Sequence, residues 1–277
     1  MTVRHSPAQS SANRLLRRIR TAKSLLGKVL VLLPLAVNLS AQAQPPRVRL
    51  EATDAYVIGQ PGVNASSPAL DLAKAILERA GLAYSVEIAP WARAYALASS
   101  DPDVLLITLG RTPERESHFH WIAPTYPLEY RAYRLKERAD VVVNTPEDLR
   151  RYRISVVRDS AIVPYLRGLK LAENRIDNGL QFIPTALDHW NKLLYGRVDL
   201  FVGTSLSVDT LCHRGNFDCN RIATAWIFPE SRITAWIALS GTTDPEIVQQ
   251  LSDAYAGLKA AGGVDRLLNP APTGDRR

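Results

Sequence analysis

A buried-strand pattern at Val104 to Leu109 is the feature that most constrains the fold of this chain. The segment holds five apolar residues in six, and Pro102 and Gly110 bound it. A short run of this kind between two turn-forming residues is typical of a strand that is covered on both faces. The chain is therefore expected to build a sheet with helices packed against it.

Strands and helices alternate before this run. A strand is expected from Val48, where apolar and polar residues alternate, and a helix over Ala69 to Ala80, where apolar residues recur with helical spacing. Gly81 ends that helix, a second strand runs from Tyr84 to Ile88, and a second helix continues to about Ser99. This alternation predicts the α/β class.

The residues after the central strand predict an anion site. Thr112 stands at a helix N-cap, Pro113 at the first helical position, and Glu114 in the first turn, where the helix dipole favours a negative charge. A strand that ends in a glycine before a helix N-terminus leaves backbone N–H groups free, and ligands gather at the carboxyl ends of such strands. Gly110, Thr112 and Arg115 are therefore candidate ligand-binding residues, with Arg115 gripping a carboxylate bidentately.

This segment also resembles a known family. In the amino-acid-type periplasmic solute-binding proteins, the family 3 extracellular solute-binding proteins of ABC importers, an Asp and an apolar strand precede a Thr-x-x-Arg motif and an aromatic-Pro-Tyr segment. The matching residues are Asp103, Gly110, Thr112, Arg115, Phe119, Trp121, Pro124 and Tyr126. The resemblance covers roughly residues 48 to 270 and rests on several loose motifs in the right order. It implies a two-lobed periplasmic binding protein-like fold (type II) with a discontinuous first lobe and a hinge of two crossings.

The resemblance also implies the domain boundaries. The first lobe is expected to comprise residues 44–135 and 226–270, and the second lobe residues 136–225. The two crossings of the hinge are expected at about 130–138 and 223–232. Residues 271–277 form a polar tail.

The N-terminal segment has the pattern of a secretory signal peptide. Residues 1–43 carry seven basic residues and no acidic one, and they include the apolar run Val29 to Leu39 and small residues before Ala43. An uncleaved membrane anchor is the alternative, but eleven apolar residues are too few to span a bilayer, which needs about 20. Arg17-Arg18 fits a twin-arginine signal poorly, so ordinary secretion is preferred. We expect a soluble monomer in the periplasm.

Removal of this leader changes the charge of the chain. The full sequence has 34 basic and 27 acidic residues, and without the seven basic residues of the leader the two numbers are equal. A nucleic-acid partner loses its compositional support, because such domains carry a concentrated positive field. The remaining 234 residues, 277 less 43, are enough for one large core or two modest ones.

The sequence has only two cysteines, Cys212 and Cys219, and both lie in one polar loop. In an oxidising compartment this isolated pair predicts a local disulfide. A metal site is the competing interpretation, but it needs more ligands than His213 supplies. The five histidines form no ligand set, and His118 and His120 are expected to be packing or solvent-facing residues. No metal and no cofactor is therefore expected.

Further ligand-binding candidates in the first lobe come from the resemblance. The segment Pro90 to Ala94 resembles a Pro-Trp-x-Arg-Ala variant of the family, in which Trp91 is an aromatic wall over the ligand and Arg93 a second cation. The alternative is that Trp91 packs into the lobe and Arg93 is a solvated helix charge. Asp54 and Tyr56 lie at the end of the first strand, where the family places ligand-contacting residues.

In the second lobe the resemblance points to Ser160 and Asp159. A strand over Ile154 to Val157 leads to the place where the family holds a Gly-Thr or Gly-Ser pair that meets the ligand carboxylate. Ser160 matches this pair, whereas Asp159 replaces the glycine. Both residues are therefore candidates, and the aspartate is a departure from the family pattern.

Thr204 bears on the chemistry of the ligand. The segment Gly196 to Gly203 resembles the family's Gly-x-Val-Asp strand, in which Asp199 is expected to be a structural turn residue. Five positions after this Asp, typical amino-acid binders have a second Asp that holds the ligand's α-ammonium, and here that position is Thr204. A hydroxyl supplies no charge, and a buried ammonium without a carboxylate is costly. The ligand is expected to be an organic acid or modified amino acid without a free α-ammonium, unless Asp159 supplies the missing carboxylate.

Three classes of function compete. A solute-binding protein, which closes two lobes on an amino acid or related organic acid and delivers it to an ABC permease in the inner membrane, needs gripping residues and no nucleophile. This class is favoured, so no enzymatic activity is expected. One alternative is an enzyme similar to the periplasmic cyclohexadienyl dehydratases, for which no motif supplies the acid. Its conceivable acids are Glu51, Asp54, Asp159 and His189.

The other alternative is a soluble ligand sensor that docks on a receptor. A membrane-tethered sensor is not expected, because no transmembrane pattern follows residue 270.

Overall fold

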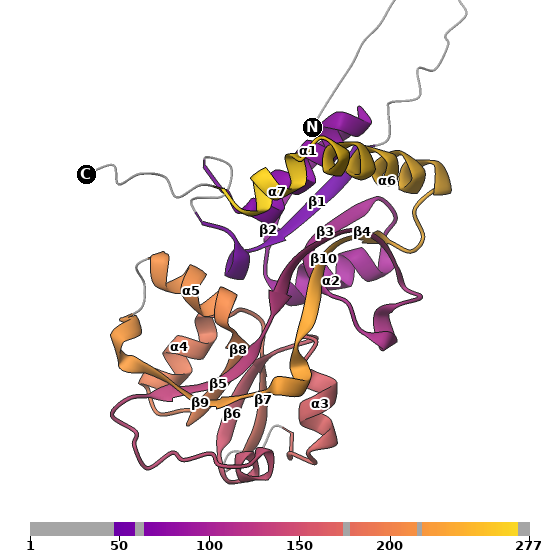
Figure 1. Ribbon diagram of the computed structural model, residues 1–277. Helices are drawn as coiled ribbons and strands as arrows, with labels where there is room; N and C mark the ends of the chain where they lie inside the picture. Colours follow the sequence, from indigo (N-terminus) through magenta and orange to yellow (C-terminus); the bar gives the residue numbers. More distant parts are fainter. Residues whose placement is uncertain (1–46, 59–63, 174–177, 215–217, 271–277) are drawn as a thin grey trace, which may run out of the picture. The chain divides into compact units, whose positions relative to one another are not determined.

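The computed structural model describes residues 47–58, 64–173, 178–214 and 218–270, which build two five-stranded sheets (Figure 1). The expected signal peptide at 1–43 and polar tail at 271–277 lie outside the described residues. Each sheet has a hydrophobic core of its own, so the described residues form two α/β lobes. Within this part of the chain no helix is both long and apolar enough to cross a bilayer.

The sheet of the first lobe has the strand order β2-β1-β3-β10-β4. Strand β1 runs parallel to β2 and β3, whereas β10 runs antiparallel to β3 and β4. Helices α1, α6 and α7 pack on one face and α2 on the other (Figure 1). The bounds are β1 Arg47–Thr53, β2 Ala83–Ala89, β3 Val104–Gly110, β4 Phe119–Leu128, β10 Ile233–Ser240, α1 Pro68–Ala80, α2 Trp91–Ser100, α6 Pro245–Ala260 and α7 Gly263–Leu268.

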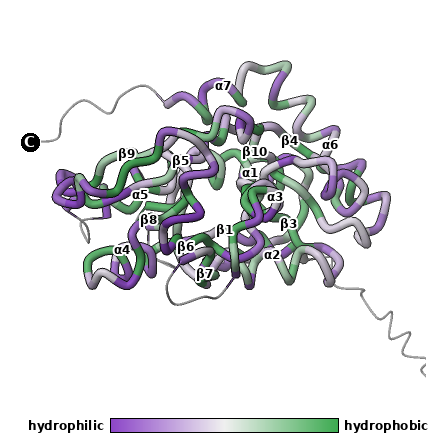
Figure 2. The backbone as a smooth tube through the Cα atoms, turned by 90° about the horizontal axis from the view of Figure 1, so that it is seen from below, coloured by the Kyte–Doolittle hydropathy of each residue, from purple (hydrophilic) through white to green (hydrophobic). Residues whose placement is uncertain are grey.

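Strand β3 is the central strand of this sheet, and helices cover both faces of the sheet. All seven of its residues are buried, as its apolar sequence predicts. The tube at β1 and β3 is mainly green in Figure 2, which marks these strands as hydrophobic. Helix α1 begins where the Ser67 hydroxyl accepts from the N–H of Leu70 at 3.2 Å, and it ends at Gly81, whose φ is 71°.

The sheet of the second lobe has the order β7-β6-β8-β5-β9. Strand β6 runs parallel to β7 and β8, and β5 runs antiparallel to β8 and β9. Helix α3 packs against one face of the sheet, and helices α4 and α5 pack against the other face. The bounds are β5 Tyr130–Leu135, β6 Arg153–Val157, β7 Gly179–Ile183, β8 Leu200–Thr204, β9 Ile222–Ile227, α3 Val163–Gly168, α4 Leu187–Leu194 and α5 Ser205–His213.

The strand pairing places the lobe boundary earlier than expected. Residues 130–135 were expected in the first lobe, yet they form β5 of the second sheet, where Tyr130 pairs with Thr204. Strand β9 belongs to the same sheet, so the chain returns to the first lobe only after Ile227. Alternating apolar residues predict a strand but do not show which strand it pairs with, and this is why the expected boundary at 135 differs.

A carboxylate joins the two crossings between the lobes. Glu129 lies in the first crossing, and its Oε1 accepts from Arg131 Nε at 2.7 Å. Its Oε2 accepts from Nη2 of Arg232, in the second crossing, at 2.7 Å. The contact to Arg232 joins the two crossings, and the contact to Arg131 orients the Glu129 carboxylate. Both contacts lie in the segment where a two-lobed protein bends.

Two expected helices are short 3₁₀ segments. The residues after β3 form the turn Pro113–Arg115, in which the Thr112 side chain caps no backbone N–H. The residues from Asp148 onwards, for which the sequence also predicts a helix, lie in the segment Pro146–Arg151. A single turn sums few peptide dipoles, so an anion at this place would be bound by the Arg115 side chain rather than by a helix dipole. The remaining 3₁₀ turns are Asp54–Tyr56, Cys219–Arg221 and Pro229–Ser231.

Asp199 is held by two arginines at the start of β8. Its Oδ2 accepts from the backbone N–H and the Nε of Arg153, both at 3.0 Å, and its Oδ1 accepts from Arg153 Nη2 at 2.8 Å. Arg138 Nη1 also donates to Oδ1, at 3.2 Å. Burial alone would raise the pKa of this carboxyl, but the hydrogen bonds from Arg153 outweigh burial and lower the pKa below its usual range.

Replacing Asp199 by asparagine is expected to lower the free energy of unfolding by about 2 kcal/mol, because the charge-assisted bonds to Arg153 are lost. Urea unfolding at neutral pH measures this change. The matched control is Asp140→Asn, which removes the exposed partner of the same Arg138 and should change the stability little. Equal effects of the two variants would contradict a structural role for Asp199.

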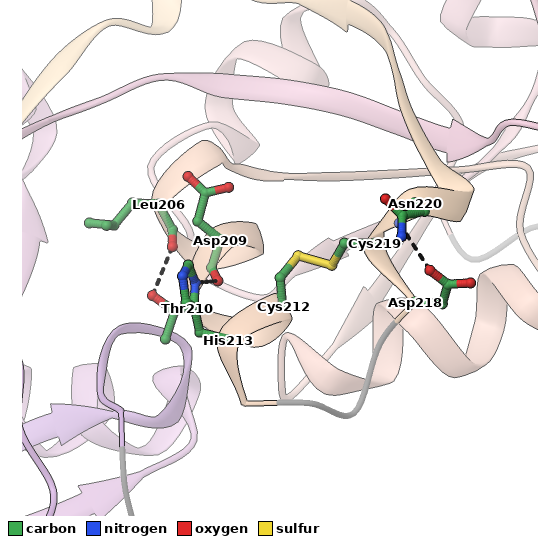
Figure 3. The surroundings of a disulfide bond; sticks show 8 residues. All are labelled: Leu206, Asp209, Thr210, Cys212, His213, Asp218, Cys219 and Asn220. Atoms are coloured by element: carbon green, nitrogen blue, oxygen red, sulfur yellow. Dashed lines mark hydrogen bonds between the residues drawn. A yellow bond between two sulfur atoms is a disulfide. The ribbon is translucent and has the colours of Figure 1, made fainter. Parts of the chain in front are cut away.

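Cys212, near the end of α5, is joined to Cys219 by a disulfide with the Cα atoms 5.8 Å apart (Figure 3). The bond closes a loop of eight residues, of which 215–217 lie outside the described residues. The sequence pattern predicts this bond.

Removing the disulfide is expected to lower the free energy of unfolding by about 2.5 kcal/mol, because the unfolded chain gains the entropy of an open loop. The measurement is urea unfolding of the oxidised protein and of the double variant Cys212→Ser, Cys219→Ser. A thiol reductant should destabilise only the first of these two proteins. If the double variant were as stable as the oxidised protein, this account of the loop would fail.

Candidate functional site

A cavity lies where the ends of β1 and β3 of the first lobe face β6, β8, α4 and α5 of the second. The volume inside it that is open to water-sized molecules is about 50 Å³. Apolar side chains such as Leu128, Val157 and Val202 form part of its wall. Of the ligand-binding residues expected from the sequence, seven line it: Asp54, Tyr56, Trp91, Gly110, Arg115, Ser160 and Thr204.

Two expected residues, Thr112 and Asp159, do not line this cavity. Both line a neighbouring, more open cavity that shares Arg115 and Ser160 with the first one. Arg93, considered as a second cation, is exposed and pairs with Glu87 at 3.0 Å. Arg115 is therefore the arginine that the fold brings to the cavity.

Arg115 is 7% exposed and connects the two lobes. Its Nη1 donates to the carbonyl of Gly110 in the first lobe at 3.0 Å, and its Nη2 donates to the carbonyl of Asp159 in the second at 2.6 Å. Its Cζ lies 4.8 Å from the ring centroid of Tyr95 and 5.9 Å from that of Trp91. Among the described residues no carboxylate forms an ion pair with it. The guanidinium is thus a buried cation held by carbonyls and aromatic rings alone.

Trp91 packs in the first lobe and also lines the cavity. It packs in the apolar cluster of the first lobe, 8% exposed, with its ring stacked on Tyr95 at a centroid distance of 5.8 Å. It also lines the cavity, and its Nε1–H has no hydrogen-bond partner among the described residues. The indole therefore offers a wall and one free donor.

Asp54 is the carboxylate that lines the cavity in the described part of the chain. Its Oδ1 is buried and has no hydrogen-bond partner there. Burial raises the pKa of this carboxyl, although the nearby Arg214 guanidinium acts in the opposite direction. Arg214 Nη1 donates to the backbone carbonyl of Asp54 at 2.6 Å, which fixes the turn that carries it.

Thr204 is both a helix cap and part of the cavity wall. Its hydroxyl accepts from the N–H of Ser207 at 3.1 Å at the start of α5, and it lies 3.3 Å from the hydroxyl of Tyr56 in the other lobe. These two contacts leave the hydroxyl one further hydrogen bond for a ligand. Thr204 therefore gives the cavity wall a hydroxyl and no charge at this position.

Asp159 occupies a position suited to glycine. Its φ is 59°, in the left-handed region that glycine adopts without strain and that aspartate tolerates. Its side chain is exposed, and only its carbonyl reaches Arg115. Asp54, rather than Asp159, is the carboxylate that lines the same cavity as Thr204 in the described part of the chain. Ser160, which follows, has a buried hydroxyl with no partner among the described residues.

His189 and Thr108 are among the polar lining residues that were not expected as ligand contacts from the sequence. His189 lies on the buried face of the amphipathic helix α4. A polar residue at such a position in the sequence pattern could have pointed to a functional side chain. Thr108 has a φ of 59°, which is strained for a β-branched residue, and its buried Oγ1 lacks a partner among the described residues. In the described chain no group of three or more His, Cys, Asp or Glu side chains is placed to hold a metal ion.

Three solved structures show what this architecture is similar to. A histidine kinase sensor domain with similarity to periplasmic binding proteins matches with a TM-score of 0.66 at 16% identity, covering 80% of this chain and 94% of its own. An amino acid ABC transporter substrate-binding protein from Streptococcus pneumoniae, bound to L-arginine, matches with a TM-score of 0.63 at 16% identity, covering 80% and 92%. This chain has the fold of the periplasmic binding proteins. An ancestral amino-acid-binding protein, a precursor of cyclohexadienyl dehydratase, has a TM-score of 0.61 at 16% identity, covering 80% and 92%.

No protein-family model and no curated protein matches the chain. The likeness to the solved structures thus concerns the periplasmic-binding-protein fold, which agrees with the two-lobed α/β architecture implied by the sequence resemblance. The structures that share the fold include transport proteins, a sensor domain and the precursor of an enzyme, so the function has to be argued from the cavity.

Proposed function

We propose that this protein captures a small carboxylate-bearing solute in the cavity between its lobes and delivers it to an ABC permease in the inner membrane. The observation that carries the proposal is the buried guanidinium of Arg115, which has no carboxylate partner among the described residues. A buried charge without a counterion is costly, so a ligand that brings the counterion gains the corresponding free energy. The contacts of Arg115 to both lobes support a role in lobe closure.

The remaining donors around the cavity fit an anionic group. The guanidinium has five N–H donors, and two of them are used by the carbonyls of Gly110 and Asp159. The Nε1–H of Trp91 and the hydroxyl of Ser160 are unpartnered in the described chain and line the same cavity. A ligand carboxylate that accepts from Arg115 of the first lobe and from the Ser160 hydroxyl of the second would contact both lobes at once, which is the requirement for ligand-driven closure.

The proposed ligand is an organic acid or an amino-acid-derived carboxylate. Thr204 offers no charge for an α-ammonium, and Asp159 does not line the cavity. An ammonium would be accepted only against Asp54, and burial disfavours the charged form of that carboxyl by raising its pKa. This makes a solute without a free α-ammonium the better match.

An enzyme on the same scaffold is the second candidate, and Asp54 is the observation that favours it. A carboxyl with a raised pKa in a ligand cavity has the property required of a general acid. Incubation with a cyclohexadienyl acid, followed by product analysis, separates this candidate from capture alone. Turnover that disappears in Asp54→Asn would establish the enzyme, and binding without turnover favours the transport protein.

Export to the periplasm and a monomeric state complete the proposal. The basic and apolar pattern of residues 1–43 supports export, and the disulfide at Cys212 and Cys219 suits an oxidising compartment. Mass spectrometry and sedimentation of the secreted protein check both points, with a new N-terminus expected near Gln44.

A thermal-shift screen of the exported protein against small carboxylates and amino acids tests the proposal. A solute at 100 times its dissociation constant should stabilise the folded protein by about 2.7 kcal/mol. The expected result is stabilisation by one or a few carboxylates. Stabilisation by none of them, or by amines and neutral solutes alone, would refute the proposed ligand class.

A further inference from the structure

The imidazole of His189 is fixed in one orientation beside the cavity. The side chain is 3% exposed, and its ring is stacked on Phe201 with the centroids 4.8 Å apart and the planes at 24°. Its Nδ1 lies 2.8 Å from the hydroxyl of Ser155 on β6. Its Nε2 is buried and has no hydrogen-bond partner among the described residues. One nitrogen is thus anchored to the protein and the other is left for another molecule.

The hydrogen bond to Ser155 indicates which nitrogen carries the proton. Ser155 is fully buried, and in the described chain its hydroxyl has His189 Nδ1 as its side-chain partner. If the hydroxyl donates to Nδ1, its proton is satisfied and the ring proton resides on Nε2. In the opposite tautomer Nδ1–H donates to Ser155, and the serine proton then needs a second buried acceptor. Each arrangement leaves one buried proton unpaired in the ligand-free protein. The first leaves it on Nε2 of His189, which lines the cavity, so that a bound molecule can accept it, whereas the second leaves it on Ser155, which lines neither cavity.

The ring is also neutral. Burial lowers the pKa of His189 to about 3, and the nearby Lys192 ammonium acts in the same direction. A neutral Nε2–H donates one hydrogen bond and contributes no charge. It therefore suits a carbonyl or hydroxyl oxygen better than it suits a second carboxylate, which would lack a counterion there.

The described residues around the smaller cavity beside His189 offer no side-chain acceptor for its Nε2–H. Besides the main cavity, His189 lines a smaller one whose other walls are mainly apolar, with Phe201, Val208 and Leu211 among them. Ser207, which lines both cavities, already donates to the carbonyl of Thr204 at 2.8 Å and accepts no side-chain bond from the ring. A molecule bound in the main cavity is the remaining source of an acceptor.

We propose that His189 Nε2–H is a ligand-binding donor that selects carboxylates carrying an additional uncharged oxygen acceptor, and that Ser155 is the positioning residue that holds the required tautomer. This inference rests on the proposed function, since it places a second contact on the solute whose carboxylate binds Arg115. The preferred solutes are accordingly oxo or hydroxy acids with an apolar body.

The tautomer is tested on the ligand-free protein and does not depend on any ligand. Nitrogen-15 NMR of the histidine rings should show Nε2 protonated and Nδ1 unprotonated in His189, with the signals assigned by their loss in His189→Gln. In Ser155→Ala the two tautomers should become mixed, while the fold stays intact by circular dichroism. A proton found on Nδ1 of the wild-type ring would overturn the proposal.

The ligand contact is tested by calorimetry with pairs of acids that differ by one oxo group, namely butyrate with acetoacetate, valerate with levulinate, and hydrocinnamate with phenylpyruvate. In at least one pair the oxo acid should bind about tenfold more tightly, because a buried donor is left unpaired by the other acid. His189→Leu should abolish this preference and His189→Gln should keep part of it, since the glutamine amide can still donate.

The outcomes distinguish this inference from the proposed function. If the acids bind without preference, or if the preference persists in His189→Leu, the role of His189 is overturned while solute capture stands. If no acid of any pair binds, the proposed ligand class fails and this inference fails with it. A preference that is lost in His189→Leu and weakened in Ser155→Ala supports the assignment of both residues.

Discussion

Replacing Arg115 by alanine is expected to weaken the binding of a carboxylate solute by about 2–5 kcal/mol, which is a loss of about 30-fold to several thousand-fold in affinity. The reason is that Arg115 is 7% exposed and forms no ion pair with a carboxylate of the described chain, so the ligand is expected to provide its counterion. Arg115→Lys should fall between alanine and the wild type, because it keeps the charge and loses the planar fork. Calorimetry with a carboxylate identified by the thermal-shift screen measures these differences.

The matched control is Arg93→Ala, which removes an exposed arginine of the same lobe that pairs with Glu87. This variant should bind the same carboxylate with unchanged affinity. Because Arg115 also bonds to the carbonyls of Gly110 and Asp159, the folding of Arg115→Ala is checked by its thermal midpoint. A folded Arg115→Ala protein with wild-type affinity would show that the carboxylate is bound elsewhere.

The second large effect is an acid-dependent loss of stability caused by His189. Burial lowers the pKa of this ring to about 3 in the folded protein, whereas the unfolded chain has the ordinary value of about 6.5. Between these values the unfolded state binds the additional proton, so the stability from this group is fully present above about pH 6.5 and is lost as the pH falls towards about 3. The loss should amount to about 2 kcal/mol at about pH 5 and increase below it.

The comparison of the wild type with His189→Gln isolates this effect. The buried carboxyls of Glu51 and Asp54 have raised pKa values and respond to acid in the opposite direction, but they are present in both proteins and cancel in the difference. Urea unfolding over this pH range should therefore show that the stability difference between the proteins shrinks or reverses as the solution becomes acidic. A difference that is independent of pH would mean that His189 has the same pKa in the folded and the unfolded protein, which would contradict its burial.

Many strands and helices were predictable where they have a local pattern, whereas β7 and α5 were not predicted and Pro113–Arg115 and Pro146–Arg151 were expected as longer helices. The seven buried residues of β3 and the capped helix α1 follow directly from apolar runs and from the residues at their ends. The lobe boundary was less predictable, because the placement of β5 depends on its pairing with β8 and β9, which are far away in the sequence. Local patterns carry no information on such partners.

The candidate site was predictable where a residue type has one dominant use. Arg115 after a strand end is an example, and the structure places it at the cavity. The carboxylate was harder to place, because the count along the sequence led to Thr204 and left Asp159 as the candidate, whereas the Asp159 side chain is exposed and does not line the cavity. Asp54, from the turn after β1, lines the cavity instead. Which carboxylate lines the cavity depends on the geometry of two loops from different lobes, and residue spacing in the sequence does not reveal that geometry.

Calorimetry of the exported protein with a carboxylate and with its carboxamide analogue tests the central claim most directly. The two solutes have nearly the same shape and differ in the charge that Arg115 is proposed to bind. The account predicts that the carboxylate binds at least about a hundredfold more tightly, and that this preference disappears in Arg115→Ala. Equal binding of the acid and the amide by the wild-type protein would contradict capture of a carboxylate at this site.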